Sequence, residues 1–172
     1  CPGHMNDLNS GNRSGWAWSI FLLPFIEEQP LHDVIDPNNR QFYELGNHAT
    51  DWTILQTRID GYRCPSDTTE EPNPSRSPFN HNVGTSNYIA CRGFFSTTGL
   101  GSNRNNGVLY GSSKTKFRDI TDGSSNTIAV GERGADANAG NWCGPGGLGS
   151  GSNSTGSVRL KINHPTSTVG FT

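Results

Sequence analysis

The sequence predicts an α+β domain, in which short N-terminal helices pack on an antiparallel β-sheet and long Gly/Pro/Asn-rich loops join the elements. Three observations favour this class. Apolar residues recur at near-helical spacing close to the N-terminus, and short strand-like runs follow in the second half. The 172 residues include 22 Gly and 10 Pro, which indicates long irregular connections around a modest core.

Helices are expected in the first half of the chain. The run "GWAWSIFLLPFIEEQPLHDVID" is interrupted by Pro24, which lacks an N–H for the helical ladder, so we expect one kinked helix or two short ones. The predicted elements of this half are helices at about 17–29 and 30–35, a polar connection at 38–47, a short helix at 53–59 and a strand at 61–64.

The second half is expected to form the sheet. A Pro-rich loop without periodicity separates it from the helices, and Asn106–Gly107 is a strong hairpin signal. The predicted elements are a loop at 65–82, a strand at 85–95, a strand at 107–111, a short helical turn or strand at 114–123, and strands at 127–130 and 158–163.

The composition indicates one domain over residues 1–172, with a Gly/Ser-rich loop at about 134–157. Only 31% of the residues are hydrophobic, so the core is expected to be small. The formal net charge is -2 and the basic residues are scattered singly, which predicts no nucleic-acid partner. The longest apolar run, "IFLLPFI", is too short to cross a bilayer.

The cysteines Cys1, Cys64, Cys91 and Cys143 contain no Cys-x-x-Cys pair, which argues against a zinc knuckle or a thioredoxin-type site. An even count in a Gly/Asn/Ser-rich chain favours one or two disulfides in an oxidising compartment. Three pairings are open. We favour Cys64 with Cys91 and Cys1 with Cys143, because the first two each border a predicted strand. The alternative is four free, buried thiols.

The stretch "FRDITDGSSNTIAVGERG", residues 117–134, concentrates polar groups as a catalytic or metal loop does. Its acidic residues lack the spacing of a calcium loop, because Glu132 lies beyond an intervening strand. The Asp-Gly dipeptide at 122–123 is typical of a turn, since an Asx side chain bonds the backbone two residues on. We expect Ile128 and Val130 to enter the core and Glu132 to pair with an arginine. The predicted structural turn motif comprises Asp122, Gly123, Asn126 and Glu132.

No constellation in the sequence predicts catalysis, a cofactor or a metal. Gly-x-Ser-x-Gly is absent, and Ser113 with Lys116 matches Ser-x-x-Lys without its companion elements. The segment "GSSKT" at 111–115 lacks the glycine spacing of a phosphate loop, and the five histidines are dispersed. The four tryptophans could stack on sugars, but such residues more often anchor a small core. We expect a protein that is not an enzyme.

Four segments in order resemble one family. "GWAWSIFLLPFIEEQPLHDVID" is similar to its Gly-Trp-x-Trp, Leu-Leu-Pro-Tyr-Leu-Glu-Gln segment, and "YRCPSD" to its Phe/Tyr-x-Cys-Pro-Ser-Asp segment. "TSNYIACRG" resembles its Thr-Asn-Tyr-x-Ala stretch, and "FRDITDGSSNTIAVGERG" its Ile-x-Asp-Gly-x-Ser-Asn-Thr-Ile-x-x-x-Glu signature. Over about residues 2–134 the chain resembles the pilin-like family abundant in planctomycetes and related bacteria, domain of unknown function 1559.

The resemblance implies the architecture of a type IV pilin or pseudopilin. Such proteins carry a prepilin cleavage and methylation motif, then a long hydrophobic helix, then a head that lies in the periplasm or at the cell surface. They typically close with His, nine residues and Asp-Gly, whereas His164 is not followed by Asp-Gly at that distance. We expect the hydrophobic helix to precede Pro2 in the complete protein. The resemblance assigns no catalytic residue.

The sequence therefore predicts a structural and interaction head domain of the bacterial cell envelope, extracellular or periplasmic. Its expected partners are other pilin-like subunits in a filament or in a type II secretion pseudopilus, and it reaches the membrane only through the N-terminal helix. The alternative is a secreted module that binds a carbohydrate or an exported ligand. A hydrolase is the third class, and it rests only on scattered Ser, His and Asp.

Overall fold

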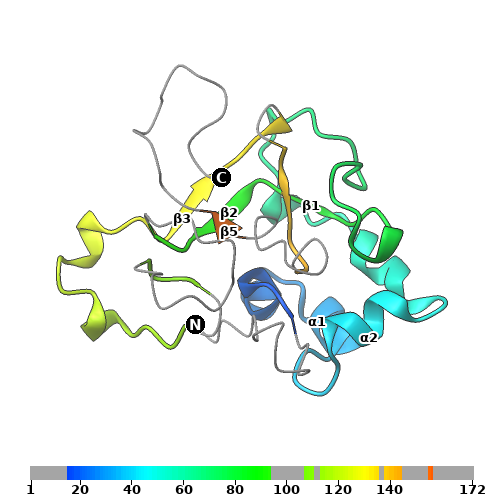
Figure 1. Cartoon of the computed structure of the whole chain (residues 1–172), viewed down its shortest axis with the longest axis horizontal. Helices are drawn as coiled ribbons and strands as arrows, with labels where there is room; N and C mark the ends of the chain where they lie inside the picture. The colour runs from blue at the N-terminus through cyan, green and yellow to red at the C-terminus, as the bar shows by residue number, and fades with distance from the viewer. Residues whose placement is uncertain (1–14, 94–106, 111–112, 136–137, 145–154, 157–172) are drawn as a thin grey trace.

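The computed structural model describes residues 15–93, 107–110, 113–135, 138–144 and 155–156 (Figure 1). In this part of the chain helices come first and short strands follow, so the predicted α+β class is confirmed. The elements are, in order, η1 (Trp18–Phe25), α1 (Gln29–Ile35), α2 (Phe42–Asn47), η2 (Asp51–Gln56), η3 (Asp60–Tyr62), η4 (Pro78–Asn80), β1 (Thr85–Ser86), β2 (Tyr88–Cys91), η5 (Phe117–Asp119), η6 (Ser124–Asn126), β3 (Val130–Glu132), β4 (Gly140–Asn141) and β5 (Thr155–Gly156), where η marks a 3-10 helix.

The first two helices are the pair that the sequence predicts, but the break between them is displaced. η1 includes Pro24 and continues to Phe25. The chain turns at Glu27, whose φ of 66° is left-handed, and α1 then carries Pro30 in its first turn, where a missing N–H costs nothing. None of the helices described here has the length and apolar composition that crossing a bilayer requires.

The predicted connection at 38–47 is wrong, because α2 forms there. A capping box begins this helix: the Glu44 carboxylate accepts a 2.9 Å hydrogen bond from the Gln41 amide, and the Gln41 side chain accepts one in return. Phe42 and Leu45 are buried beneath it. The sequence does not indicate this helix clearly, because its single i, i+3 apolar pair lies among polar residues.

The predicted helix at 53–59 is present as η2, whereas the predicted strand at 61–64 is wrong. Tyr62 and Arg63 donate backbone hydrogen bonds to Ile59 and Asp60, which closes the 3-10 turn η3 instead. The turn places Tyr62 in the core and Arg63 just beyond it.

Two small sheets hold the second half of the chain. One pairs β1 with β4, antiparallel, and the other has the order β3-β2-β5. β2 and β3 are antiparallel, with Tyr88 opposite Glu132, while β5 runs parallel to β2. The predicted strand at 85–95 is thus split into β1 and β2 by Asn87. Residues 114–123 contain the helical turn η5.

The predicted hairpin strand at 107–111 is not formed over the described residues 107–110. Gly107 and Leu109 instead donate backbone hydrogen bonds to Arg92 and Cys91, which ties the segment to the end of β2. Asn106 and the predicted strand at 158–163 lie outside the described residues.

The main core lies between the helical segments and the strand β4. Two indoles at its centre are fully buried, and both have hydrogen-bond partners: Trp16 donates to the Arg40 carbonyl at 2.7 Å and Trp142 to the Thr57 carbonyl at 3.0 Å. Trp142 belongs to the Gly/Ser-rich segment, so this polar stretch contributes a central core residue. The buried cluster comprises Trp16, Ile20, Leu23, Ile35, Phe42, Leu45, Leu55, Ile59, Tyr62, Val83, Trp142 and Cys143.

Close packing around Trp142 predicts that Gly84→Ala destabilises the protein by about 1–3 kcal/mol. A Cβ at Gly84 would lie 2.5 Å from the Thr57 carbonyl oxygen and against the Trp142 indole nitrogen. The matched control is Gly61→Ala, where the nearest atom, Ile26 Cδ1, is 3.7 Å away. Urea unfolding of both variants measures the free energy of unfolding. Equal stabilities would contradict this account of the packing.

Candidate functional site

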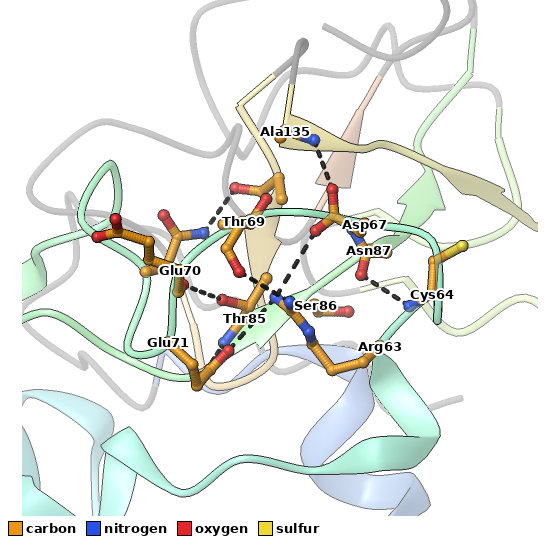
Figure 2. A network of polar contacts seen from close by, with 12 residues as sticks. Arg63, Cys64, Asp67, Thr69, Glu70, Glu71, Thr85, Ser86, Asn87 and Ala135 are labelled. Carbon is orange, nitrogen blue, oxygen red and sulfur yellow. Dashed lines mark hydrogen bonds and ion pairs between the residues drawn. The ribbon is translucent and has the colours of Figure 1, made fainter.

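A cluster of buried charged and polar groups lies where three segments of the chain meet (Figure 2). The segments are the loop after η3, the β1–β2 region and the chain just after β3, which are the regions that carry three of the four family-like motifs. We call this group the Arg63 cluster. It comprises Arg63, Cys64, Asp67, Thr69, Glu71, Thr85, Asn87, Arg133 and Ala135.

The Arg63 guanidinium lies between two carboxylates. Its Nη1 is 3.6 Å from Asp67 Oδ2 and 3.4 Å from Glu71 Oε2, and its Nη2 donates a 2.8 Å hydrogen bond to the Thr69 carbonyl. The three charged side chains are 10%, 4% and 15% exposed. A charge so far removed from water is stable only when it is paired and hydrogen-bonded, and Arg63 satisfies this condition.

Both carboxylates also accept hydrogen bonds from backbone amides. Asp67 Oδ1 accepts from the Ala135 N–H at 2.7 Å, and Glu71 Oε1 accepts from the Thr85 N–H at 2.8 Å. The loop at 63–71 is thereby fixed to β1 on one side and to the chain after β3 on the other. Each carboxylate thus has one oxygen bonded to a backbone amide and the other within ion-pair distance of Arg63.

Asn87 bridges the remaining segments and is fully buried. Its side chain accepts a 2.8 Å hydrogen bond from the Cys64 N–H and donates one of 3.0 Å to the Arg133 carbonyl. Its backbone N–H donates to Tyr62, and its carbonyl accepts from the Arg133 N–H at 2.7 Å. One residue thus satisfies backbone groups of two segments that are far apart in the sequence.

Arg133 is itself almost fully buried, at 4% exposure. Burial, followed by the nearby charge of Arg76, lowers its pKa to about 10. The guanidinium therefore keeps its proton at neutral pH. Arg76, whose pKa burial also lowers, donates hydrogen bonds to the Ala139 carbonyl at 3.0 Å and the Asn138 carbonyl at 2.6 Å. The two arginines extend the buried polar region toward β4.

The N-terminal helical segment joins the same region through Tyr62. The phenol donates a 2.7 Å hydrogen bond to the Ser19 carbonyl, and the Ser19 hydroxyl donates to the Trp142 carbonyl. Burial, and secondarily the charge of Glu28, raises the pKa of Tyr62. Because the phenol stays protonated, it remains a hydrogen-bond donor, and all four family-like segments are connected.

The stretch 117–134 forms the turn that its sequence predicts, but a different side chain holds it. Asn126 Nδ2 donates to the Asp122 carbonyl at 3.0 Å, and Thr127 Oγ1 donates to the Gly123 carbonyl at 3.1 Å. Gly123 has a φ of 84°, which favours glycine. Within the described contacts the Asp122 carboxylate accepts no hydrogen bond, in contrast to the predicted Asx bond.

The prediction that Ile128 and Val130 enter the core is wrong. They are 40% and 36% exposed, because β3 is an edge strand that no further layer covers among the described residues. Glu132 is also exposed, and none of the ion pairs in the described part of the chain includes it. The buried end of the motif begins one residue later, at Arg133.

The predicted disulfide between Cys64 and Cys91 is not formed. Cys64, Cys91 and Cys143 are free thiols, and Cys1 lies outside the described residues. The Asn87 side chain accepts a hydrogen bond from the Cys64 N–H, so Cys64 lies beside Asn87. Cys91 follows Asn87 by four residues of extended chain, which span about 13 Å. Disulfides join residues whose Cα atoms are less than about 7 Å apart. Burial raises the pKa of both the Cys91 and the Cys143 thiol.

Other sequence candidates lie apart from the Arg63 cluster. Ser113 is buried and accepts a 3.3 Å hydrogen bond from the Tyr110 N–H, while Lys116 is exposed. Trp16, Trp18 and Trp142 are core residues, as the commoner interpretation of such tryptophans predicts. The described residues contain no group of three or more His, Cys, Asp or Glu that could hold a metal ion.

Sequence reasoning did not identify Arg63, Glu71, Asn87 or Arg133 as members of one site. Three of them lie inside the quoted motifs, so the segments were found but the roles were not. A charged residue next to a core aromatic, as Arg63 follows Tyr62, is the available signal. Their partners are 4 to 46 residues away along the chain, and spacing alone does not reveal them.

Asn126→Ala is expected to lower the free energy of unfolding by about 1 kcal/mol, because it removes the side-chain bond that closes the turn. Asp122→Ala is the matched control. It should stay within about 0.5 kcal/mol of wild type, since only the backbone carbonyl of Asp122 takes part. Thermal and urea unfolding measure both effects. A larger loss in the Asp122 variant would contradict this assignment.

The environment of the Asp67 carboxylate predicts that the free energy of unfolding depends on pH in the acid range. Burial raises its pKa, but the nearby Asn87 and Thr69 side chains and the hydrogen bond from the Ala135 amide outweigh burial. The charge of Arg63 acts in the same direction, so the pKa of Asp67 lies below its usual range. A lowered folded pKa contributes stability that is complete above the unfolded value of about 3.9 and is lost as the pH falls through the folded value.

Wild type should therefore be more stable than Asp67→Asn at neutral pH, and the difference should shrink as the pH falls below about 4. Urea unfolding of both proteins across a pH series measures this difference in free energy. Asp33→Asn, at an exposed position on α1, is the control. A wild-type advantage that persists undiminished at about pH 2 would contradict the inferred pKa shift.

The comparisons with known proteins assign the chain to a family. The family model described as "Protein of unknown function (DUF1559)" matches residues 2–168, nearly the whole sequence. No curated protein and no solved structure matches the chain. The four segments that resemble this family are the same segments that the buried contacts of Arg63, Asn87 and Tyr62 join. The chain belongs to the DUF1559 family.

Proposed function

We propose that this chain is the head domain of a type IV pilin-like or pseudopilin subunit, with a structural and interaction role in the bacterial cell envelope. The observation that carries the proposal is the use of the motif residues. The charged side chains of the Arg63 cluster form hydrogen bonds with backbone amides and carbonyls of the chain itself. These contacts join the segments that resemble the pilin-like family.

The electrostatics of the cluster support a structural role over a catalytic one. A general acid or base works best with a pKa near the operating pH and with access to its substrate. Asp67 is 4% exposed, and its pKa is shifted further from neutrality. Arg133 keeps its proton and is equally inaccessible. Such groups stabilise a folded head without requiring a substrate or a cofactor.

The proposal includes the setting of the head. Its partners are other pilin-like subunits in a surface filament or in a type II secretion pseudopilus, and an N-terminal apolar helix of the complete subunit attaches it to the membrane. Family membership and the resemblance of the four segments to the planctomycete pilin-like proteins support this setting. In it the head needs only to fold stably and to present a surface to neighbouring subunits.

Cell fractionation in the native bacterium tests the proposal. The protein should be released from intact cells by mechanical shear, together with filaments that an antibody against the head labels in electron micrographs. Deleting the prepilin peptidase should leave a longer precursor in the membrane and remove the sheared fraction. A periplasmic marker protein, which shear should not release, controls for lysis. Free monomer in the medium, independent of the peptidase, would contradict the proposal and favour a secreted binding module.

A further inference from the structure

One end of the molecule carries an exposed aromatic ring among cations. Phe117 in η5 is 86% exposed, and Lys114, Lys116 and Arg118 surround it in the sequence. Asp119 folds back, accepting a hydrogen bond from the Lys116 N–H at 2.8 Å and lying 3.7 Å from Arg118 Nε. We call residues 114–119 the basic arm. With three cations and one carboxylate, it carries two net positive charges.

A second exposed apolar surface has the opposite charge. Phe25, at the end of η1, is 81% exposed, and Val34 on α1 is 55% exposed. We call residues 25–36 the acidic corner. It contains no Lys or Arg and carries four carboxylates, a net charge of minus four with its histidine neutral. These carboxylates belong to Glu27, Glu28, Asp33 and Asp36.

The two surfaces lie on different parts of the molecule. In Figure 1 the yellow-green segment with η5 and η6 projects to the left, while α1 lies at the lower right. The two are also separate in sequence and make no element-to-element packing that would bury Phe117 or Phe25. The arm of one molecule therefore cannot cover the corner of the same molecule.

We propose that the basic arm of one copy of this chain docks on the acidic corner of a second copy, with Phe117 and Phe25 at the centre of the contact. An apolar centre within a charged rim is the usual composition of a protein interface, and opposite charges on the two surfaces select this pairing over arm-to-arm contact. Burying an isolated aromatic ring against a partner is a common source of interface energy.

The contact joins two different surfaces, so it is heterologous and leaves one arm and one corner free at the ends of each pair. Contacts of this kind extend into open chains unless a rotation closes them into a ring. Both surfaces are small and their charges exposed, so the association should be weak and should weaken further as salt screens the charges. This contact rests on the proposed function, because the filament or pseudopilus is the setting in which copies of the chain meet.

Sedimentation velocity of the purified 172-residue chain over a wide concentration range tests the contact. Wild type should self-associate at low salt. An arm variant, Lys116→Glu with Arg118→Glu, and a corner variant, Glu27→Lys with Asp33→Lys, should each need at least about tenfold higher concentration to associate. An equal mixture of the two variants should associate again, because the unaltered corner of the arm variant meets the unaltered arm of the corner variant. Arg58→Glu, at an exposed position outside both surfaces, should behave as wild type.

Thermal unfolding checks that the variants are folded. If a charge reversal unfolds the chain, Phe117→Ser and Phe25→Ser take its place, since both rings are exposed. A wild type that stays monomeric at every concentration, or variants that associate unchanged or fail to recover on mixing, would overturn the contact. A monomeric head that nevertheless appears in sheared filaments would refute this contact alone and leave the proposed function standing.

Discussion

The burial of the Arg63 guanidinium is the constraint on which the arrangement of the loops depends. A permanently charged group at 10% exposure requires carboxylates and carbonyl oxygens close by, and the loop from Asp67 to Glu71 supplies them by wrapping around it. The carboxylates in turn accept from the amides of Thr85 and Ala135, so the position of the loop also fixes two distant segments. Regular helices and sheets would not impose these positions here, because the strands are only two to four residues long.

Three buried asparagines of the described residues, Asn73, Asn87 and Asn141, have a related role. Short strands leave many backbone groups without ladder partners, and buried groups of this kind must find other ones. Asn side chains supply both a donor and an acceptor with peptide-like geometry. Asn73 donates to the Ala139 and Gly140 carbonyls, Asn87 bridges Cys64 and Arg133, and Asn141 accepts from the amides of Cys143 and Gly144. In this fold polar side chains therefore satisfy many of the buried backbone groups that extended sheets satisfy in other folds.

The sequence was sufficient for the class of fold, the first helices and the β1–β2 region, because these rest on local periodicity. It was not sufficient where tertiary contacts override local pattern. α2 is stabilised by a capping box and one apolar pair in a polar run, and Ile128 and Val130 alternate as a buried strand would although β3 lies at an edge. The cysteines suggested disulfides, yet the neighbourhood of Cys64 is set by Asn87. The Arg63 cluster depends on partners distant in sequence, which composition and spacing do not encode.

The stretch 117–134 contains a buried end and an exposed part, which its composition does not distinguish. Its C-terminal end enters the scaffold through Arg133, whose backbone pairs with Asn87, whereas the preceding turns extend away from the core (Figure 1). Because the scaffold is held by internal polar contacts, the effects of changes in the exposed turns are separated from those of changes in the buried cluster. A domain built in this way can alter the charge and shape of its projecting surface while the Arg63 cluster keeps the same fold.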